Sequence, residues 1–160
     1  MIDLADRETS EFLHSGCALL VCTVGADSRP HAGRAWGLTV IDADTGVLRL
    51  LVEGDDAVTL ANVRSQRALA VTATKVTNFH SVQFKGRGLA IEELTAADET
   101  KHAQYTRAFL TDVHDANGYA MDLMQRWAGR PVVACLVTVE SSFDQTPGPS
   151  AGMAIDRSGS

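Results

Sequence analysis

The stretch Ser81-Val82-Gln83-Phe84-Lys85-Gly86-Arg87-Gly88 alternates apolar or small residues with polar or charged ones. Side chains of a β-strand point to opposite faces in turn, so this period of two predicts a strand, which we extend over residues 79–92. One face, directed at a core, carries Val82, Phe84, Gly86, Gly88 and Ala90. The other face carries Ser81, Gln83, Lys85 and Arg87. This second face is either the solvent side of an antiparallel strand or a strip that holds a ligand with polar edges and an anionic tail.

Five more strands and four helices complete the predicted fold. The strands are expected over residues 17–24, 31–41, 47–52, 68–74 and 132–139, and the helices over residues 6–13, 55–64, 95–113 and 119–127. The first strand is almost continuously apolar and is therefore predicted to be buried on both faces. Strands in a mostly antiparallel order, with helices inserted between them, are typical of a closed or nearly closed barrel of the mainly-β (α+β) class.

The second predicted strand combines small and polar residues. Alternation places His31, Gly33, Ala35, Gly37 and Thr39 on one face, and Arg34, Trp36, Leu38 and Val40 on the other. Small residues let a flat ring approach the backbone closely, whereas glycine in a strand equally marks a bulge or a sharp bend. Both interpretations stay open at this point.

Composition narrows the class of protein. The 160 residues are 45% hydrophobic and 21% charged, as in an ordinary globular domain, and a net charge of −6 opposes broad, charge-driven binding of nucleic acids. The apolar runs are shorter than the roughly 20 residues of a membrane helix, so no membrane partner is expected. Cys17, Cys22 and Cys135 form no paired motif, which indicates reduced thiols in the cytoplasm. We expect one domain over residues 1–150 and a disordered tail over residues 151–160.

The sequence lacks the common catalytic and metal-binding motifs. It contains no P-loop, no dinucleotide fingerprint and no GxSxG elbow. The five histidines show no HExxH or similar spacing, so no metal site is expected. No catalytic residue is assigned on these grounds.

Three segments, taken in order, are more informative than any single motif. They are the hairpin Arg29-Pro30-His31 leading to Arg34-Ala35-Trp36, the helix Thr59-Leu60-Ala61-Asn62 leading to Arg67-Ala68-Leu69-Ala70-Val71, and the strand over residues 81–88. Their order and spacing resemble the pyridoxamine 5′-phosphate oxidase-like family of FMN-binding proteins. The resemblance covers most of the chain, from about residue 11 to residue 139.

The resemblance implies a six-stranded antiparallel split β-barrel with flanking helices, which pairs as a homodimer and holds FMN in each of two clefts between the subunits. The residues implied to contact FMN are Arg34, Ala35, Trp36, Gly37, Leu51, Val52, Thr59, Ser81, Gln83 and Lys85. Trp127, late in the chain, is implied to reach the flavin of the partner subunit. The implied activity is that of an FMN-dependent oxidoreductase acting on a small organic substrate.

One segment departs from the pattern of that family. Where phosphate-binding members carry a serine with basic residues after the third strand, this chain has Glu53-Gly54-Asp55-Asp56-Ala57-Val58. Carboxylates repel a phosphate dianion unless they point outward or unless the helix N-terminus, Arg34 or Lys85 outweighs them. Pyridoxamine phosphate is therefore not expected as the substrate. The alternatives are a non-catalytic protein of the same fold and a protein that binds haem or another planar ligand.

Overall fold

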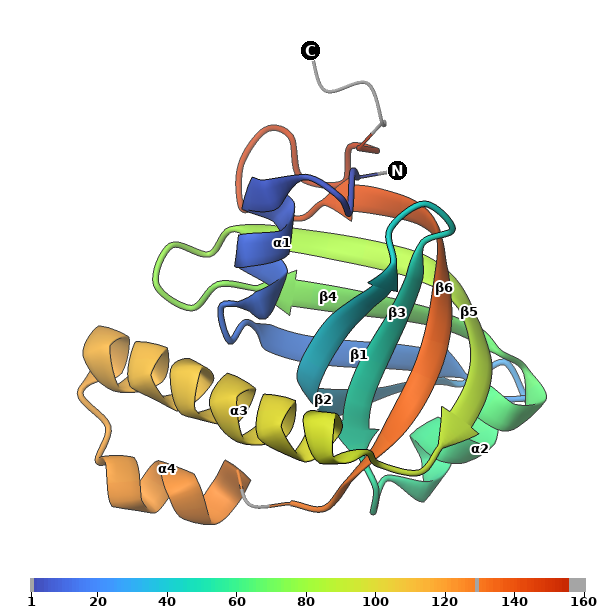
Figure 1. Cartoon of the computed structure of the whole chain (residues 1–160). Helices are drawn as coiled ribbons and strands as arrows, with labels where there is room; N and C mark the ends of the chain where they lie inside the picture. The colour runs from blue at the N-terminus through green and yellow to red at the C-terminus, as the bar shows by residue number, and fades with distance from the viewer. Residues whose placement is uncertain (1, 129, 156–160) are drawn as a thin grey trace.

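The computed structural model describes residues 2–128 and 130–155, apart from the side chain of Trp127. Within this part of the chain, four helices accompany six strands (Figure 1). The helices are α1 (Arg7–His14), α2 (Ala57–Ser65), α3 (Ala96–Asn117) and α4 (Met121–Ala128). The strands are β1 (Ala18–Val24), β2 (Pro30–Asp42), β3 (Val47–Glu53), β4 (Ala68–Thr74), β5 (Ser81–Glu92) and β6 (Val132–Asp144).

The six strands form a closed barrel in the order β1-β2-β3-β6-β5-β4, and all neighbours are antiparallel. The predicted six-stranded antiparallel barrel with flanking helices is therefore confirmed. The predicted core face of β5 is confirmed for Val82 and Phe84, which are buried in the barrel interior, and for the buried Gly88, but Gly86 and Ala90 are only partly buried, because the strand's register shifts next to each of them. Closure leaves no unpaired sheet edge, which removes the usual site of strand-to-strand aggregation.

The molecule has two apolar cores. The first fills the barrel and includes Leu38, Leu50 and Val71. The second lies outside the barrel wall, where Trp36 and Leu51 pack against Phe109 and Leu110 of α3. Figure 1 shows α3 lying across the front of the barrel with α4 running beneath it. The α3–α4 pair is therefore attached to the barrel chiefly through this second core.

A β-bulge in β2 changes the predicted pattern of faces. Ala35 pairs with Val52, but the next pair is Leu38 with Leu50, so one extra residue is inserted in β2. Ala35 and Leu38 consequently both face the barrel interior, while Trp36 faces α3. The prediction that Leu38 and Val40 share a face with Trp36 is wrong, because strict alternation ends at the bulge.

The first strand is also exposed more than its sequence suggests. Leu19 and Val21 are buried, whereas Leu20 and Val24 are 44% and 38% exposed and the Cys22 thiol is exposed. The prediction that β1 is buried on both faces is therefore wrong, since its outer face carries apolar residues that the described chain leaves exposed.

The C-terminal residues up to 155 continue onto the barrel. β6 extends to Asp144, five residues beyond the predicted end, and Phe143 forms a β-bridge with Ala154. The amide of Ile155 donates to the carbonyl of Ser142 at 2.9 Å. Part of the expected tail thus lies against β6, whereas residues 156–160 fall outside the described residues.

Arg49 of β3 fixes the start of α3. Its guanidinium donates two hydrogen bonds of 2.8 Å to the buried Asp98 carboxylate and pairs with Glu92 of β5. Asp98 also completes a capping box with Thr95. The hydrogen bonds from Arg49 lower the pKa of Asp98 to about 2, despite the opposing effect of burial.

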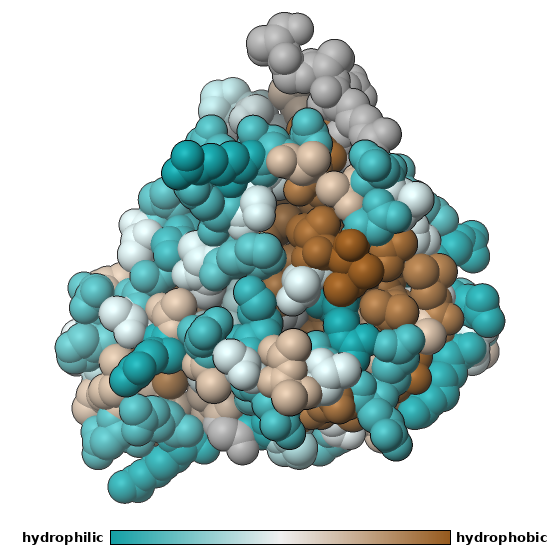
Figure 2. Space-filling view, in the orientation of Figure 1, coloured by the Kyte–Doolittle hydropathy of each residue, from teal (hydrophilic) through white to brown (hydrophobic). Residues whose placement is uncertain are grey.

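In the part of the chain that the structure describes, no helix combines the length and the apolar character needed to cross a bilayer. Figure 2 shows apolar side chains gathered on the strand wall above α3, at the centre right of the view. Ile41 and Leu89 are among the exposed large apolar residues of the molecule. Contiguous exposed apolar area is typical of surfaces that contact a protein partner or a ligand.

Asp98→Ala is expected to lower the free energy of unfolding by about 2–4 kcal/mol, because it leaves Arg49 buried without its main partner and removes the capping box. Glu92→Gln, at the exposed arm of the network, is expected to cost less than about 1 kcal/mol. Urea unfolding measures both. Because the pKa of Asp98 is lowered on folding, its contribution is complete above about pH 4 and falls as the pH approaches 2. Equal effects of the two variants would contradict this assignment.

Candidate functional site

The outer face of β2, β1, β4 and β5 forms a shelf of two cross-strand rows. The strand registers align one row as Arg34, Leu20, Thr72 and Gln83, and the next as Ala32, Cys22, Ala70 and Lys85. These eight residues are called the shelf below. Their neighbours along the strands, such as Leu19, Val71 and Phe84, face the barrel interior, which places the shelf residues outside.

The middle of the shelf carries no charged side chain, and each of its two ends carries a cation. Leu20, Thr72, Cys22 and Ala70 form the floor. Arg34 stands at one end, and Gln83 and Lys85 stand at the other. With strands about 4.8 Å apart, the backbones of Arg34 and Gln83 are separated by about 14 Å. Such a surface can accept a flat ring against the floor and hydrogen-bond or charge contacts at its ends.

Side chains of the neighbouring strands hold the β5 end of the shelf in place. The Gln83 amide donates to the Thr72 hydroxyl at 3.2 Å, and the Lys85 ammonium lies 4.5 Å from the centre of the Phe143 ring. Ser81 is buried just beyond this end, where its hydroxyl donates to the Phe79 carbonyl at 2.8 Å. Gln83 and Lys85 therefore lie at the surface as expected, whereas the Ser81 hydroxyl is engaged within the chain.

Arg34, at the other end, borders two hollows. The first is a largely apolar cavity of about 530 Å³ between β1, β2 and the α3–α4 pair, lined by Ala18, Val76, Phe109, Leu110, Val113, Tyr119, Leu123 and Met124 as well as Arg34. The second is a polar hollow of about 250 Å³ that also contains His31, Glu53, Asp56 and Arg130. The Arg34 side chain thus connects the shelf to an apolar and to a polar recess.

Five of the residues implied to bind FMN are buried in the cores. Ala35 and Val52 belong to the barrel interior, while Trp36 and Leu51 belong to the second core. The indole of Trp36 donates to Glu53 at 3.0 Å and meets the Phe109 ring edge-to-face at 5.7 Å. Gly37 is buried as well, and a Cβ there would approach the Leu51 side chain to 2.7 Å. These five buried residues therefore belong to the barrel wall and to the second core, next to Arg34 in the fold.

Asp56 occupies the N-terminus of α2. Its carboxylate accepts from the amide and the hydroxyl of Thr59, at 3.0 and 2.6 Å, and contacts the His31 ring nitrogen at 2.9 Å. Burial raises the pKa of Asp56, but these hydrogen bonds outweigh it and leave the pKa below its ordinary value. Thr59, implied to contact FMN, is buried and gives its hydroxyl to this cap.

Asp55 turns away from Asp56 toward another partner. Its carboxylate accepts from the Arg130 guanidinium at 2.9 Å, and the same guanidinium lies 4.0 Å from Glu53. Helix N-termini attract anions through their free amides and dipole. At α2 the protein's own carboxylate already fills that position, so the acidic segment that departs from the family pattern folds into a closed network with His31, Thr59 and Arg130.

Trp127 lies in α4, but its side chain is outside the described part of the structure, so its implied contact with a partner's flavin stays a prediction. Three shelf residues, Leu20, Cys22 and Thr72, are not indicated by the motifs. Thr72 could have been found from the alternation of β4, where it lies between the buried Val71 and Ala73, whereas Leu20 and Cys22 stand in an almost wholly apolar strand. The motifs do not indicate Arg130 either, because it is distant from Asp55 in the sequence and contacts it only in the folded chain.

Comparisons with solved structures find the fold of this chain in other proteins. No family model and no curated protein matches the chain. Among solved structures, HupZ of Group A Streptococcus has a TM-score of 0.57 at 18% identity, over 92% of this chain and 98% of that one. The fold is shared across this length. At such an identity the likeness extends to the fold alone.

Two further structures carry names of redox enzymes. An F420 reductase matches at a TM-score of 0.52 and 14% identity, over 83% of this chain and 94% of that one. A candidate pyridoxamine 5′-phosphate oxidase of Lactobacillus delbrueckii matches at 0.52 and 16% identity, over 86% and 92%. The chain has the fold of the pyridoxamine 5′-phosphate oxidase-like split barrels. The resemblance seen in the sequence is thus confirmed at the level of the fold.

Asp56→Ala is expected to lower the free energy of unfolding by about 1–2 kcal/mol, because it removes the N-cap of α2. Asp56→Asn keeps a capping side chain and is expected to cost less. Urea unfolding at neutral pH tests the order of the two variants. Since the pKa of Asp56 is lowered on folding, the difference between wild type and Asp56→Asn should shrink as the pH falls below about 4. A difference that grows on acidification would contradict the network.

Proposed function

We propose that the shelf binds FMN and that the chain is an FMN-dependent oxidoreductase of the pyridoxamine 5′-phosphate oxidase-like family, acting on a small molecule other than pyridoxamine phosphate. One observation carries this proposal: a floor of uncharged residues, Leu20, Cys22, Ala70 and Thr72, runs between Arg34 at one end and Gln83 and Lys85 at the other. The names of two fold neighbours, a reductase and a candidate oxidase, support redox chemistry on this fold.

The described residues suit the ring system of FMN better than its phosphate. The flat floor and the Gln83 amide suit a ring system with polar edges, and FMN when bound supplies the hydride and electron chemistry. The phosphate fits poorly at α2, because Asp56 occupies the N-terminus of that helix. Arg34 and Lys85 remain as the shelf cations that would hold an anionic tail. Gln83 would orient the ring, since Thr72 already fixes its amide.

The same acidic network supports a substrate without a phosphate group. Glu53 and Asp56 line the polar hollow beside Arg34 and Arg130, and Asp55 pairs with Arg130 next to it. A phosphorylated substrate entering there would meet two carboxylates, and Arg130 is already engaged by Asp55 and Glu53. A neutral or weakly charged organic substrate avoids this cost, which is why pyridoxamine phosphate is not proposed.

We also propose that the shelf is completed by a second copy of the chain. Exposed apolar side chains surround it: Leu20 and Val24 on β1, and Tyr119 and Leu123, which are 58% and 61% exposed beside the apolar cavity. Contiguous exposed apolar area on a small domain favours a protein partner. A twofold partner would cover these residues and enclose a ring lying on the shelf.

A second candidate is a non-catalytic protein that binds haem or another planar ligand on the same shelf. The observation that favours it is the filled N-terminus of α2, where a phosphate-bearing cofactor would otherwise find an anion site. The visible absorption spectrum of the protein purified from cells separates the two, followed by titration with FMN and with haem. Retention of a flavin spectrum through dialysis supports the oxidoreductase; a colourless protein that takes up haem but not FMN would overturn it.

Lys85→Gln is expected to weaken FMN binding about tenfold, because it removes a charged contact to the phosphate end. The matched control is Arg87→Gln, which removes a cation from the same strand beyond the shelf, where Arg87 pairs with Glu140. Fluorescence titration with FMN and with riboflavin measures the effect. The loss should be confined to Lys85→Gln and to FMN. Equal losses for riboflavin would show that Lys85 does not hold the phosphate.

Leu123→Asp is expected to convert the dimer to monomer, because a carboxylate would be buried against the partner. Leu89→Asp serves as control, since Leu89 is similarly exposed but lies on β5 away from the shelf. Sedimentation velocity over a range of protein concentrations reports the state of each variant. A wild-type protein that stays monomeric throughout would refute the proposed pairing.

A further inference from the structure

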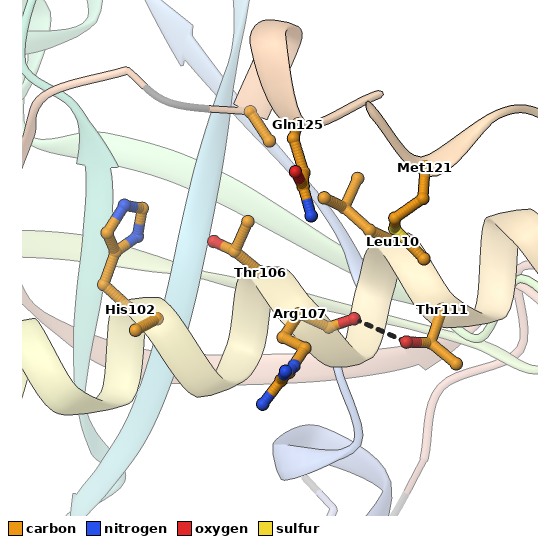
Figure 3. A pocket seen from close by; sticks show the side chains of 9 residues that line it. His102, Thr106, Arg107, Leu110, Thr111, Met121 and Gln125 are labelled. Atoms are coloured by element: carbon orange, nitrogen blue, oxygen red, sulfur yellow. Dashed lines mark hydrogen bonds between the residues drawn. The ribbon is translucent and has the colours of Figure 1, made fainter. Parts of the chain in front are cut away.

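A second recess lies next to the apolar cavity of the shelf, on a neighbouring face of α3, and Leu110 lines both. It is a groove of about 560 Å³ between α3 and α4, a volume within the range of small-molecule sites. Nine residues line it: His102, Ala103, Thr106, Arg107, Leu110, Thr111, Met121, Gln125 and Ala128. Figure 3 shows Gln125 reaching from α4 toward α3, with Leu110 and Met121 on one side and His102 on the other.

The lining is amphipathic and its charge is of one sign. Leu110, Met121 and Ala128 provide an apolar part, whereas Thr106, Arg107 and Gln125 provide hydrogen-bond donors. Arg107 is cationic, and none of the nine lining residues is a carboxylate. In a chain with a net charge of −6, a recess lined in this way selects anions over cations.

One lining group has a hydrogen-bonding capacity that the described chain does not use. The Thr106 hydroxyl is buried and finds no hydrogen-bond partner among the described residues. The neighbouring Thr111 hydroxyl differs, because it donates to the Arg107 carbonyl at 3.0 Å. Buried polar groups are nearly always paired, so the Thr106 hydroxyl is a hydrogen-bonding group that the described residues leave unused.

The histidine of the groove has a defined orientation. His102 Nδ1 donates to the Trp36 carbonyl at 3.1 Å, at the bulge of β2. This bond holds the imidazole at the end of the groove and leaves Nε2 as the ring atom available to a ligand. Because Trp36 follows Arg34 and Ala35 on β2, this bond joins the groove to the strand that carries Arg34.

We propose that the α3–α4 groove is a binding site for a small amphipathic carboxylate. Its apolar body lies against Leu110, Met121 and Ala128, and its carboxylate pairs with Arg107 and accepts from Thr106 and Gln125. This site is separate from the shelf, and its occupancy does not depend on whether the shelf binds a flavin.

The test uses naphthalene-2-carboxylate as the probe and the full chain without added flavin. Isothermal titration calorimetry gives the affinity, and ¹H–¹⁵N chemical-shift mapping gives the location. The expected result is saturable binding with shifts centred on Thr106, Arg107 and Gln125. The neutral amide of the same ring system should bind about tenfold more weakly, since it lacks the charge that Arg107 recognises.

Three variants complete the experiment. Arg107→Gln should weaken the binding of naphthalene-2-carboxylate about tenfold and leave the affinity for the neutral amide unchanged. Ala103→Phe, at an exposed position that lines the groove, should block both compounds. Arg126→Gln removes an exposed cation of α4 that does not line the groove, and it should change neither affinity. Equal weakening by Arg107→Gln and Arg126→Gln, or shifts centred on Ala18, Val76 and Tyr119, would overturn the proposal.

Discussion

The outward side chain of Trp36 makes the contacts on which the arrangement of α3 beside both recesses depends. Ala35, which precedes it, faces the barrel interior, and the bulge that follows lets Leu38 face the interior as well. Trp36 then supplies the contact that attaches α3, through its ring to Phe109 and through its carbonyl to His102. Without the extra residue, Trp36 would still face away from Ala35, but Leu38 would share its outer face and the barrel would lose a fully buried side chain.

The charged residues around the shelf limit where an anionic group could bind. A helix N-terminus beside a strand end is an ordinary anion site, yet at α2 the protein fills it with Asp56 and ties Asp55 to Arg130. The stabilisation of α2 and the handling of a cofactor phosphate therefore compete for the same amides. Arg34 and Lys85 are the two cations of the shelf, one at each end. This arrangement favours a planar ligand whose anionic group lies away from α2.

The two recesses differ in a way that follows from their positions. The shelf lies on the barrel wall and is bordered by exposed apolar residues such as Leu20 and Leu123, so its enclosure needs another molecule. The groove lies between two helices of one chain and is bordered by Arg107 and Gln125. Leu110 lines both the groove and the apolar cavity beside the shelf, which lie on neighbouring faces of α3. A shift of α3 against the barrel would therefore alter both recesses.

The sequence by itself determined the barrel, the order of its elements and the surface positions of Gln83 and Lys85, because strand alternation and turn residues are local properties of the chain. It also indicated the unusual acidity after β3. Only the tertiary structure decided that Asp56 caps α2, that Arg130 meets Asp55, and that Leu20 and Thr72 lie between Arg34 and Gln83. These contacts join residues far apart in the chain, and their geometry depends on strand register and on one bulge, neither of which a local pattern encodes.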